Sequence, residues 1–123
     1  MPIIDIDIVL KPREELRHDL ALDVANATGE ALGVPPGEAW VKVRTIAPEC
    51  YAESGGGPPE GVCPVFVSVV LADDGSREKR QEQADILATT IATVCGRRKE
   101  HVHIIFAPPA RGRIAFGGKL MIL

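Results

Sequence analysis

The sequence predicts an α+β fold in which duplicated β-α-β units form a four-stranded sheet with two helices on one face. Several segments alternate apolar and polar residues with period two, which is typical of strands. Two further segments repeat apolar residues every three or four positions, as amphipathic helices do. The same order of elements occurs twice along the chain, and short halves of this kind pack both helices against one sheet face.

The first half is predicted to contain a strand, a helix and a second strand. Residues 3–10 alternate with period two and predict the strand. Pro12, followed by two glutamates, predicts that a helix starts there, because proline suits a first helical turn and acids suit the helix dipole. Gly33 and the prolines after it end this helix. Residues 40–46 predict a strand with one cationic face, in which Trp40 is expected to pack rather than to stack on a ligand.

The second half repeats the order strand, helix and strand after a glycine-rich interval. Residues 55–57 are glycines that precede a strand, which indicates a hairpin or linker rather than a phosphate-binding loop. Residues 64–71 are rich in β-branched side chains and predict that strand. Ser76 is the expected N-cap of the second helix, and Gly96 is its expected end. Residues 102–106 predict the last long strand.

The chain of 123 residues is expected to form one domain made of two repeats, about 1–57 and 62–123. Pro2 and Pro64 lie 62 residues apart, whereas pairing Lys42 with His103 requires an offset of 61, so the register between the repeats stays open by one residue. Right-handed crossovers make the two strands within each half parallel. The sheet face without helices would carry cationic and aromatic residues, which predicts its burial in an oligomer.

Composition and charge argue against several classes of protein. The net charge is −3, whereas a domain that binds nucleic acid normally carries a basic excess, so no nucleic-acid partner is expected. The longest uncharged apolar stretch is far shorter than the roughly 20 residues of a membrane span, and no export signal is visible. The three cysteines lack the close pairing of zinc or redox motifs, which favours reduced thiols and a cytoplasmic location.

Three features together resemble the tautomerase superfamily, whose members resemble 4-oxalocrotonate tautomerase and macrophage migration inhibitory factor. They are Met1-Pro2-Ile3-Ile4 opening directly into a strand, a second β-α-β unit beginning at Pro64, and Ala115-Phe116-Gly117-Gly118 near the end. The resemblance covers nearly the whole chain and implies the four-stranded tautomerase fold. The length of this chain fits the family members with two fused units. Such members typically form trimers, so the resemblance implies a homotrimer.

The resemblance assigns catalysis to Pro2. A small second residue permits removal of Met1, which leaves a secondary amine at the N-terminus. Partial burial and nearby cations disfavour the protonated amine and lower its pKa toward the working pH, as a general base requires. If Met1 is retained, Pro2 is an amide and cannot be a base. Pro64, taken as the corresponding position of the second half, lies inside the chain and is not expected to be catalytic.

Positioned cations would hold a carboxylate substrate and stabilise the enolate that forms when a proton leaves carbon. The matches to the family pattern are imperfect, since a lysine and a histidine stand where an arginine is expected, which weakens bidentate carboxylate binding there. No cofactor is implied, and no third ligand accompanies the histidines near residue 101, so no metal site is expected. The expected substrate-binding residues are Arg77, Lys42, His103, Arg13 and Arg113.

The function that follows is a cofactor-independent tautomerase acting on an enol or unsaturated 2-oxo acid. Hydratase and dehalogenase chemistry is disfavoured, because acids stand where those relatives carry arginines and Phe116 falls near the water-activating position. Two alternatives stay open. One is a decarboxylase of a small 3-oxo acid at the same proline site, and the other is a non-catalytic ferredoxin-like ligand-binding module, which needs no free N-terminal proline.

Overall fold

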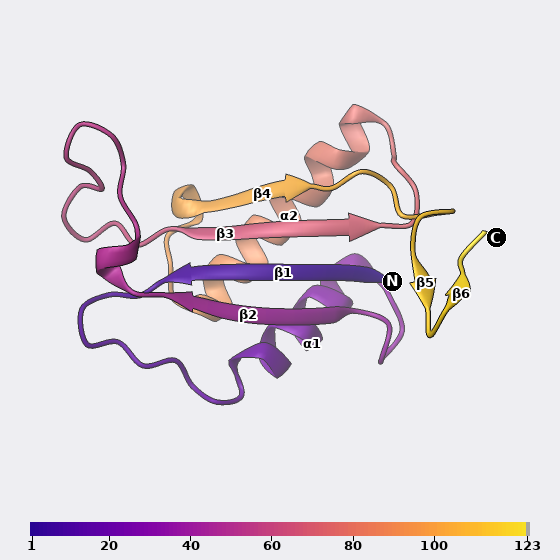
Figure 1. Ribbon diagram of the computed structural model, residues 1–123, viewed down its shortest axis with the longest axis horizontal. Helices are drawn as coiled ribbons and strands as arrows, with labels where there is room; N and C mark the ends of the chain where they lie inside the picture. The colour runs from indigo at the N-terminus through magenta and orange to yellow at the C-terminus, as the bar shows by residue number, and fades with distance from the viewer. Residues whose placement is uncertain (123) are drawn as a thin grey trace.

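A four-stranded sheet forms the centre of the computed structural model, which describes residues 1–122 (Figure 1). The strands are β1 (Pro2–Val9), β2 (Trp40–Ile46), β3 (Val65–Leu71) and β4 (Val102–Phe106), and their order in the sheet is β2-β1-β3-β4. β1 is parallel to β2 and β3 is parallel to β4, while β1 and β3 are antiparallel in the middle. The predicted parallel pairing within each half is therefore confirmed.

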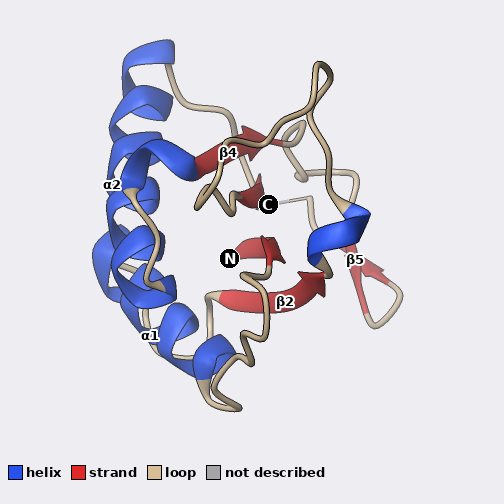
Figure 2. Ribbon diagram, turned by 90° about the vertical axis from the view of Figure 1, so that its left-hand side faces the viewer, coloured by secondary structure: helices blue, strands red, loops and turns tan. Residues whose placement is uncertain are grey.

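Two helices, α1 (Leu20–Leu32) and α2 (Arg77–Cys95), lie on the same side of the sheet (Figure 2). α2 begins as predicted, because the Ser76 hydroxyl accepts a hydrogen bond from the Lys79 amide at 3.0 Å. It ends at Gly96, which adopts the left-handed conformation that glycine tolerates best. This arrangement confirms the predicted α+β class. No helix among residues 1–122 combines the length and apolarity that a membrane span needs.

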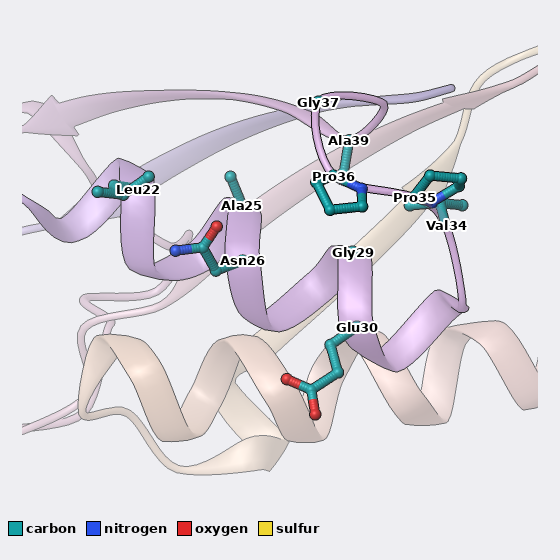
Figure 3. Close-up of a pocket in the computed structure, with 10 residues that line it drawn as sticks. All are labelled: Leu22, Ala25, Asn26, Gly29, Glu30, Val34, Pro35, Pro36, Gly37 and Ala39. Atoms are coloured by element: carbon teal, nitrogen blue, oxygen red, sulfur yellow. The ribbon is translucent and has the colours of Figure 1, made fainter.

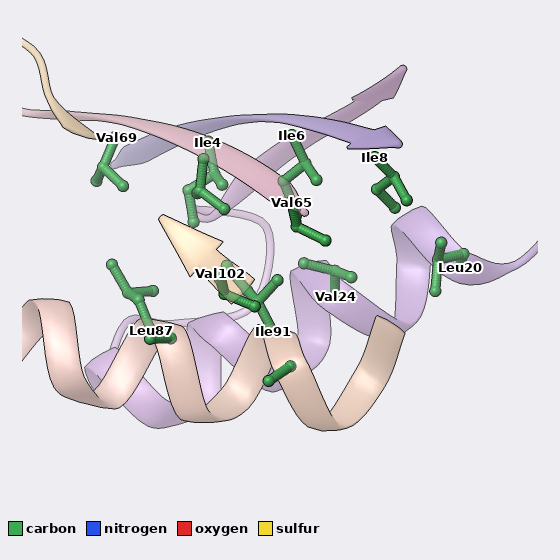
Figure 4. Packing of buried hydrophobic residues seen from close by; sticks show 13 residues of the cluster. Ile4, Ile6, Ile8, Leu20, Val24, Val65, Val69, Leu87, Ile91 and Val102 are labelled. Atoms are coloured by element: carbon green, nitrogen blue, oxygen red, sulfur yellow. The ribbon is translucent and has the colours of Figure 1, made fainter. Parts of the chain in front are cut away.

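The hydrophobic core lies between the sheet and the two helices (Figure 4). Alternate residues of β1 and β3 point toward the helices and are fully buried, so the period-two pattern of the sequence becomes one face of the sheet. Burying each such side chain contributes about 1.5–3 kcal/mol. The strand residues are Ile4, Ile6, Ile8, Val65, Val67 and Val69, and the helices add Val24, Leu87 and Ile91.

The predicted helix start at Pro12 is wrong, because α1 begins only at Leu20. The segment before it forms turns, and Arg13 takes a left-handed backbone conformation with φ of 64°, which interrupts a helix. Glu14 does not cap a helix there. Its carboxylate accepts a hydrogen bond from the Lys11 amide at 3.0 Å and is bound by an arginine from the other half of the chain.

That arginine is Arg97, whose side chain is only 3% exposed. It donates to the carboxylate of Glu14 at 2.7 and 3.1 Å, to the carbonyl of Cys63 at 3.0 Å and to the carbonyl of Val9 at 3.0 Å. These bonds join the end of β1, the segment before β3 and the segment after α2. We call this group the Arg97 clasp, and it closes the end of the sheet that lies opposite Pro2.

The clasp predicts an acid-sensitive contribution to stability. The hydrogen bonds from Arg97 hold the pKa of the Glu14 carboxyl below its ordinary value of 4.5. The folded state thus binds this proton less readily than the unfolded chain, so the contribution is present above the ordinary pKa and is lost as the pH falls through the folded value. We expect denaturant titrations to show that Glu14→Gln destabilises the protein at pH 7, and that this difference shrinks toward pH 3. A difference that stays constant over this range would contradict the assignment.

The connections contain short elements that complete the fold. Glu53 and Gly57 exchange backbone hydrogen bonds at 3.0 and 3.1 Å, so the glycine-rich interval is a hairpin, one of the two forms predicted for it. Near the C-terminus Gly117 and Gly118 have φ of 58° and 88° and form the turn of a second hairpin. The remaining elements are η1 (Pro48–Cys50), η2 (Lys99–His101), β5 (Ala115–Phe116) and β6 (Lys119–Leu120).

The register between the two repeats follows from which residues point inward. Inward residues of β1 carry even numbers and those of β3 carry odd numbers, so matching faces requires an odd offset. This excludes the offset of 62 and favours 61, at which Lys42 and His103 correspond and both lie exposed on the uncovered face. Cys63 then corresponds to Pro2. The prediction that Pro64 is the counterpart of Pro2 is therefore wrong.

Candidate functional site at the start of β1

The ring of Pro2 is buried beneath the sheet, but its nitrogen points along the sheet toward β2. The Leu10 amide donates to the Ile46 carbonyl of β2 at 2.9 Å, whereas the Val9 amide donates at 3.0 Å to the carbonyl of Pro64, the residue just before β3. Backbone amides of a strand alternate in direction, so the nitrogens of even-numbered residues in β1 face β2. The nitrogen of Pro2 is therefore directed toward the residues at the start of β2.

A hollow of about 320 Å³ lies at this place, and its lining residues are Met1, Gly37, Glu38, Trp40 and Phe116. The indole nitrogen of Trp40 donates to the Gly37 carbonyl at 3.0 Å, which fixes the ring against the loop before β2. The rings of Trp40 and Phe116 meet edge to face, with centroids 5.5 Å apart and an interplanar angle of 85°. We call this hollow the aromatic hollow. Met1, the residue attached to the nitrogen of Pro2, forms part of its lining.

Phe116 reaches the aromatic hollow because the C-terminal segment is attached to the end of β3. The Arg111 guanidinium donates to both carboxylate oxygens of Asp73 at 2.7 and 2.6 Å, and its amide donates to the Ala72 carbonyl at 3.0 Å. These hydrogen bonds hold the pKa of the Asp73 carboxyl below its usual value. Arg111 is thus engaged in the fold, and the hairpin after it presents Phe116 to β2.

Two of the predicted cations lie at the same end of the sheet as Pro2. The Arg113 amide donates to the Ala110 carbonyl at 2.7 Å, and the Ala110 amide donates to the carbonyl of Leu71, the residue paired with Pro2. Arg77 is the first residue of α2, which follows β3 at this same end. The start of β1, the start of β2 and the C-terminal hairpin also meet there (Figure 1).

Arg77 lines a second, cationic hollow of about 220 Å³ with Arg80, Gln81, Ala84 and Phe106. Arg80 donates to the Gly75 carbonyl at 2.6 Å, which holds its guanidinium over the start of α2. Positive charge and a helix N-terminus together suit a carboxylate. Within one chain this hollow is separated from β1 by β3, so it does not open onto the nitrogen of Pro2.

Lys42 lies on the uncovered face of the sheet, two residues after Trp40. Its ammonium is 3.2 Å from the carboxylate of Asp5, the residue paired with it across the strands. The next pair repeats the pattern, since Arg44 donates to Asp7 at 2.9 Å. Lys42 therefore forms part of a charged cross-strand ladder, and the ring of Pro2 points to the opposite face.

His103 and Arg13 lie away from Pro2 within one chain. His103 pairs with Phe66, and the two rings are 5.4 Å apart on the uncovered face. Phe66 pairs with Asp7, five residues along β1 from Pro2, which corresponds to about 16 Å of strand. Arg13 follows the opposite end of β1, beside the Arg97 clasp. One chain does not bring these two residues to the proline.

A further groove of about 350 Å³ runs between α1 and the loop of residues 34–39 (Figure 3). Its lining is mostly apolar, and Glu30 is the one titratable residue in it. The groove contains none of the predicted site residues, and it shares only Gly37 of its lining with the aromatic hollow. Among residues 1–122 no three histidine, cysteine or acidic side chains come together to hold a metal ion.

The lining of the aromatic hollow is not predicted by the sequence pattern. Trp40 was expected to pack; it does contact Phe116, yet half of it is exposed beside the hollow. Glu38 was not singled out. The signals present in the sequence were the Pro-Pro-Gly turn just before Glu38 and the glycine pair just after Phe116, since both mark tight turns that direct neighbouring side chains.

Comparisons with known proteins support the fold. No family model and no curated protein matches the sequence. Among solved structures, a wild-type fused 4-OT symmetric trimer has a TM-score of 0.74 at 13% identity, with 97% of this chain and 94% of that chain covered. The macrophage migration inhibitory factor of Trichinella spiralis has a TM-score of 0.72 at 14% identity, with 96% and 98% covered. FG41 malonate semialdehyde decarboxylase, inhibited by 3-bromopropiolate, has a TM-score of 0.68 at 18% identity, with 94% and 88% covered.

The same topology argues against the ferredoxin-like alternative. In that fold another strand separates the two parallel strands of each β-α-β unit, which is therefore called split. Here the two strands of each unit are direct neighbours in the order β2-β1-β3-β4. The chain therefore has the fold of the tautomerase and macrophage migration inhibitory factor structures.

Proposed function

We propose that the protein is a member of the tautomerase superfamily that uses the nitrogen of Pro2 as a general base on an enol or unsaturated 2-oxo acid. One observation carries this proposal: the nitrogen of Pro2 is directed at a hollow beside the first residue of β2, in a fold shared with tautomerases. Removal of Met1 is part of the proposal, because only a free secondary amine can accept a proton there.

The proposed reaction moves one proton and needs no cofactor. The amine of Pro2 accepts the hydroxyl proton of the enol, the oxygen–carbon bond becomes a carbonyl, and the ammonium that results returns a proton to carbon. Negative charge develops on the oxygen during this transfer. Arg113, which lies at the Pro2 end of the sheet, is the proposed partner of this oxygen within the same chain. Arg77, whose hollow does not open onto the Pro2 of its own chain, is proposed to bind the carboxylate of a substrate held at the proline of a neighbouring subunit.

The remaining predicted cations require neighbouring subunits. We propose a homotrimer in which the uncovered sheet faces are buried, so that Lys42, His103 and Arg13 of one chain approach the proline of another. The fused 4-OT is a trimer in its structure, which supports this assembly. The uncovered face also exposes the apolar side chain of Ile105, 54% of which is accessible in one chain, and burial of such side chains favours association.

The proposal is tested by blocking the amine without altering the rest of the chain. Purified protein whose intact mass shows loss of Met1 is compared with protein that carries one extra residue before Pro2, using ketonisation of 2-hydroxymuconate and phenylenolpyruvate followed by absorbance. We expect the extension to lower kcat/KM by at least about 100-fold, because the nitrogen becomes an amide. Equal rates in the two proteins, or no rate in either, would overturn the proposal.

A decarboxylase of a small 3-oxo acid is the second candidate for the same proline. The similarity to malonate semialdehyde decarboxylase over 94% of this chain favours it. The two activities are separated by product, since only the decarboxylase releases carbon dioxide from a 3-oxo acid. Release of carbon dioxide that depends on a free Pro2, without enol ketonisation, would select this candidate.

A further inference from the structure

We infer that the Pro2 site selects an enol acid with an aromatic body and a single carboxylate over an enol dicarboxylate. This inference rests on the proposed function and concerns only which substrate the site takes. It follows from the shape and charge of the aromatic hollow, whose lining contains two aromatic rings, one carboxylate and no cationic side chain.

The two rings form a preorganised apolar wall. The side chains of Trp40 and Phe116 are 50% and 37% exposed, so each keeps surface free for contact with a ligand. Their positions are fixed by the hydrogen bond from Trp40 to Gly37 and by the turn that pairs Phe116 with Lys119. Fixed rings lose little conformational freedom on binding, and ring–ring contacts are favourable beyond the area that they bury.

The charge at the hollow disfavours a second carboxylate. Glu38 lines it and forms no side-chain hydrogen bond or salt bridge with any residue in the described range 1–122. The arginines that suit a carboxylate line the other hollow, beside α2. In the proposed trimer, a substrate whose reacting carbon lies at Pro2 can place one carboxylate on the cations that a neighbouring chain brings to the proline. Its other end then enters the aromatic hollow, where the carboxylate of Glu38 is a like charge.

The experiment compares kcat/KM for phenylenolpyruvate and for 2-hydroxymuconate in protein that lacks Met1. We expect the wild-type ratio to favour phenylenolpyruvate by at least about tenfold. Trp40→Ala should lower kcat/KM for phenylenolpyruvate by about tenfold and change that for 2-hydroxymuconate by less than about twofold, while Trp40→Phe restores most of the loss. Glu38→Gln should raise kcat/KM for 2-hydroxymuconate by about fivefold.

Two exposed positions outside the aromatic hollow supply matched controls. Leu22→Ala removes an exposed apolar side chain of α1, and Glu60→Gln removes a carboxylate from the loop before β3, so neither should alter the substrate ratio. A wild-type preference for 2-hydroxymuconate that requires a free Pro2 would overturn the inference and leave the proposed function standing. An equal loss on both substrates in Trp40→Ala would also overturn it. Absence of any Pro2-dependent rate would overturn the proposed function itself.

Discussion

Replacing Pro2 with alanine is expected to lower kcat/KM for enol ketonisation by about 100-fold in protein that has lost Met1. Alanine is also a small second residue, so the variant should still lose Met1, and intact mass checks this. The alanine amine is primary and rotates about its backbone bond, whereas the pyrrolidine ring fixes the direction of the proline nitrogen. The ring of Pro2 is also buried, which positions the nitrogen toward β2.

A second proline variant separates catalysis from folding. Pro59 lies exposed in the loop before β3, at the other end of the sheet, so Pro59→Ala should keep the wild-type rate. Thermal unfolding of both variants shows whether the loss of a buried ring has weakened the fold. Wild-type kcat/KM in a folded Pro2→Ala protein would exclude the proline as the base.

Arg97→Met is expected to lower the free energy of unfolding by about 3–5 kcal/mol, the usual cost of breaking a buried ion pair. The variant leaves the Lys11 amide as the remaining donor to the Glu14 carboxylate and removes hydrogen bonds from the carbonyls of Val9 and Cys63. Methionine fills part of the space but supplies no donor. Denaturant titration at pH 7 measures the change.

The next residue provides a control of the same type. The guanidinium of Arg98 is 77% exposed and binds Glu100 at 2.7 Å, so Arg98→Met should change the free energy of unfolding by less than about 1 kcal/mol. Similar effects of the two substitutions would show that the Arg97 clasp does not stabilise the fold through burial. The double variant Arg97→Met, Glu14→Leu should recover much of the loss, because it leaves no unpaired buried charge.

The strands and α2 could be predicted because their signals are local. Alternating residues in β1 and β3 become the two faces of the sheet, and Ser76 caps α2 through its own side chain. The start of α1 could not be predicted in the same way. Pro12 and the glutamates after it satisfy the rules for a first helical turn, yet Glu14 is bound by Arg97, 83 residues later in the chain. A tertiary contact thus overrides the local preference.

The candidate site could likewise be predicted only where its signals are local in the sequence. Pro2 could be proposed from its place before a strand, and Gly117 and Gly118 indicated the hairpin turn. The contact of Trp40 with Phe116 joins segments 76 residues apart, and no local pattern in the sequence predicts it. The offset between the two repeats could not be predicted either, because it depends on which face of each strand is buried.

The Arg97 clasp has a consequence for how this protein tolerates change. The clasp lies at the end of the sheet where the second repeat carries Cys63, the counterpart of Pro2. There the buried side chain of Arg97 donates a hydrogen bond to the Cys63 carbonyl. The buried ion pair that we expect to stabilise the fold and the proposed site at Pro2 thus lie at opposite ends of the sheet. Substitutions at the aromatic hollow are therefore expected to leave the hydrogen bonds of the Arg97 clasp, and their contribution to folding, intact.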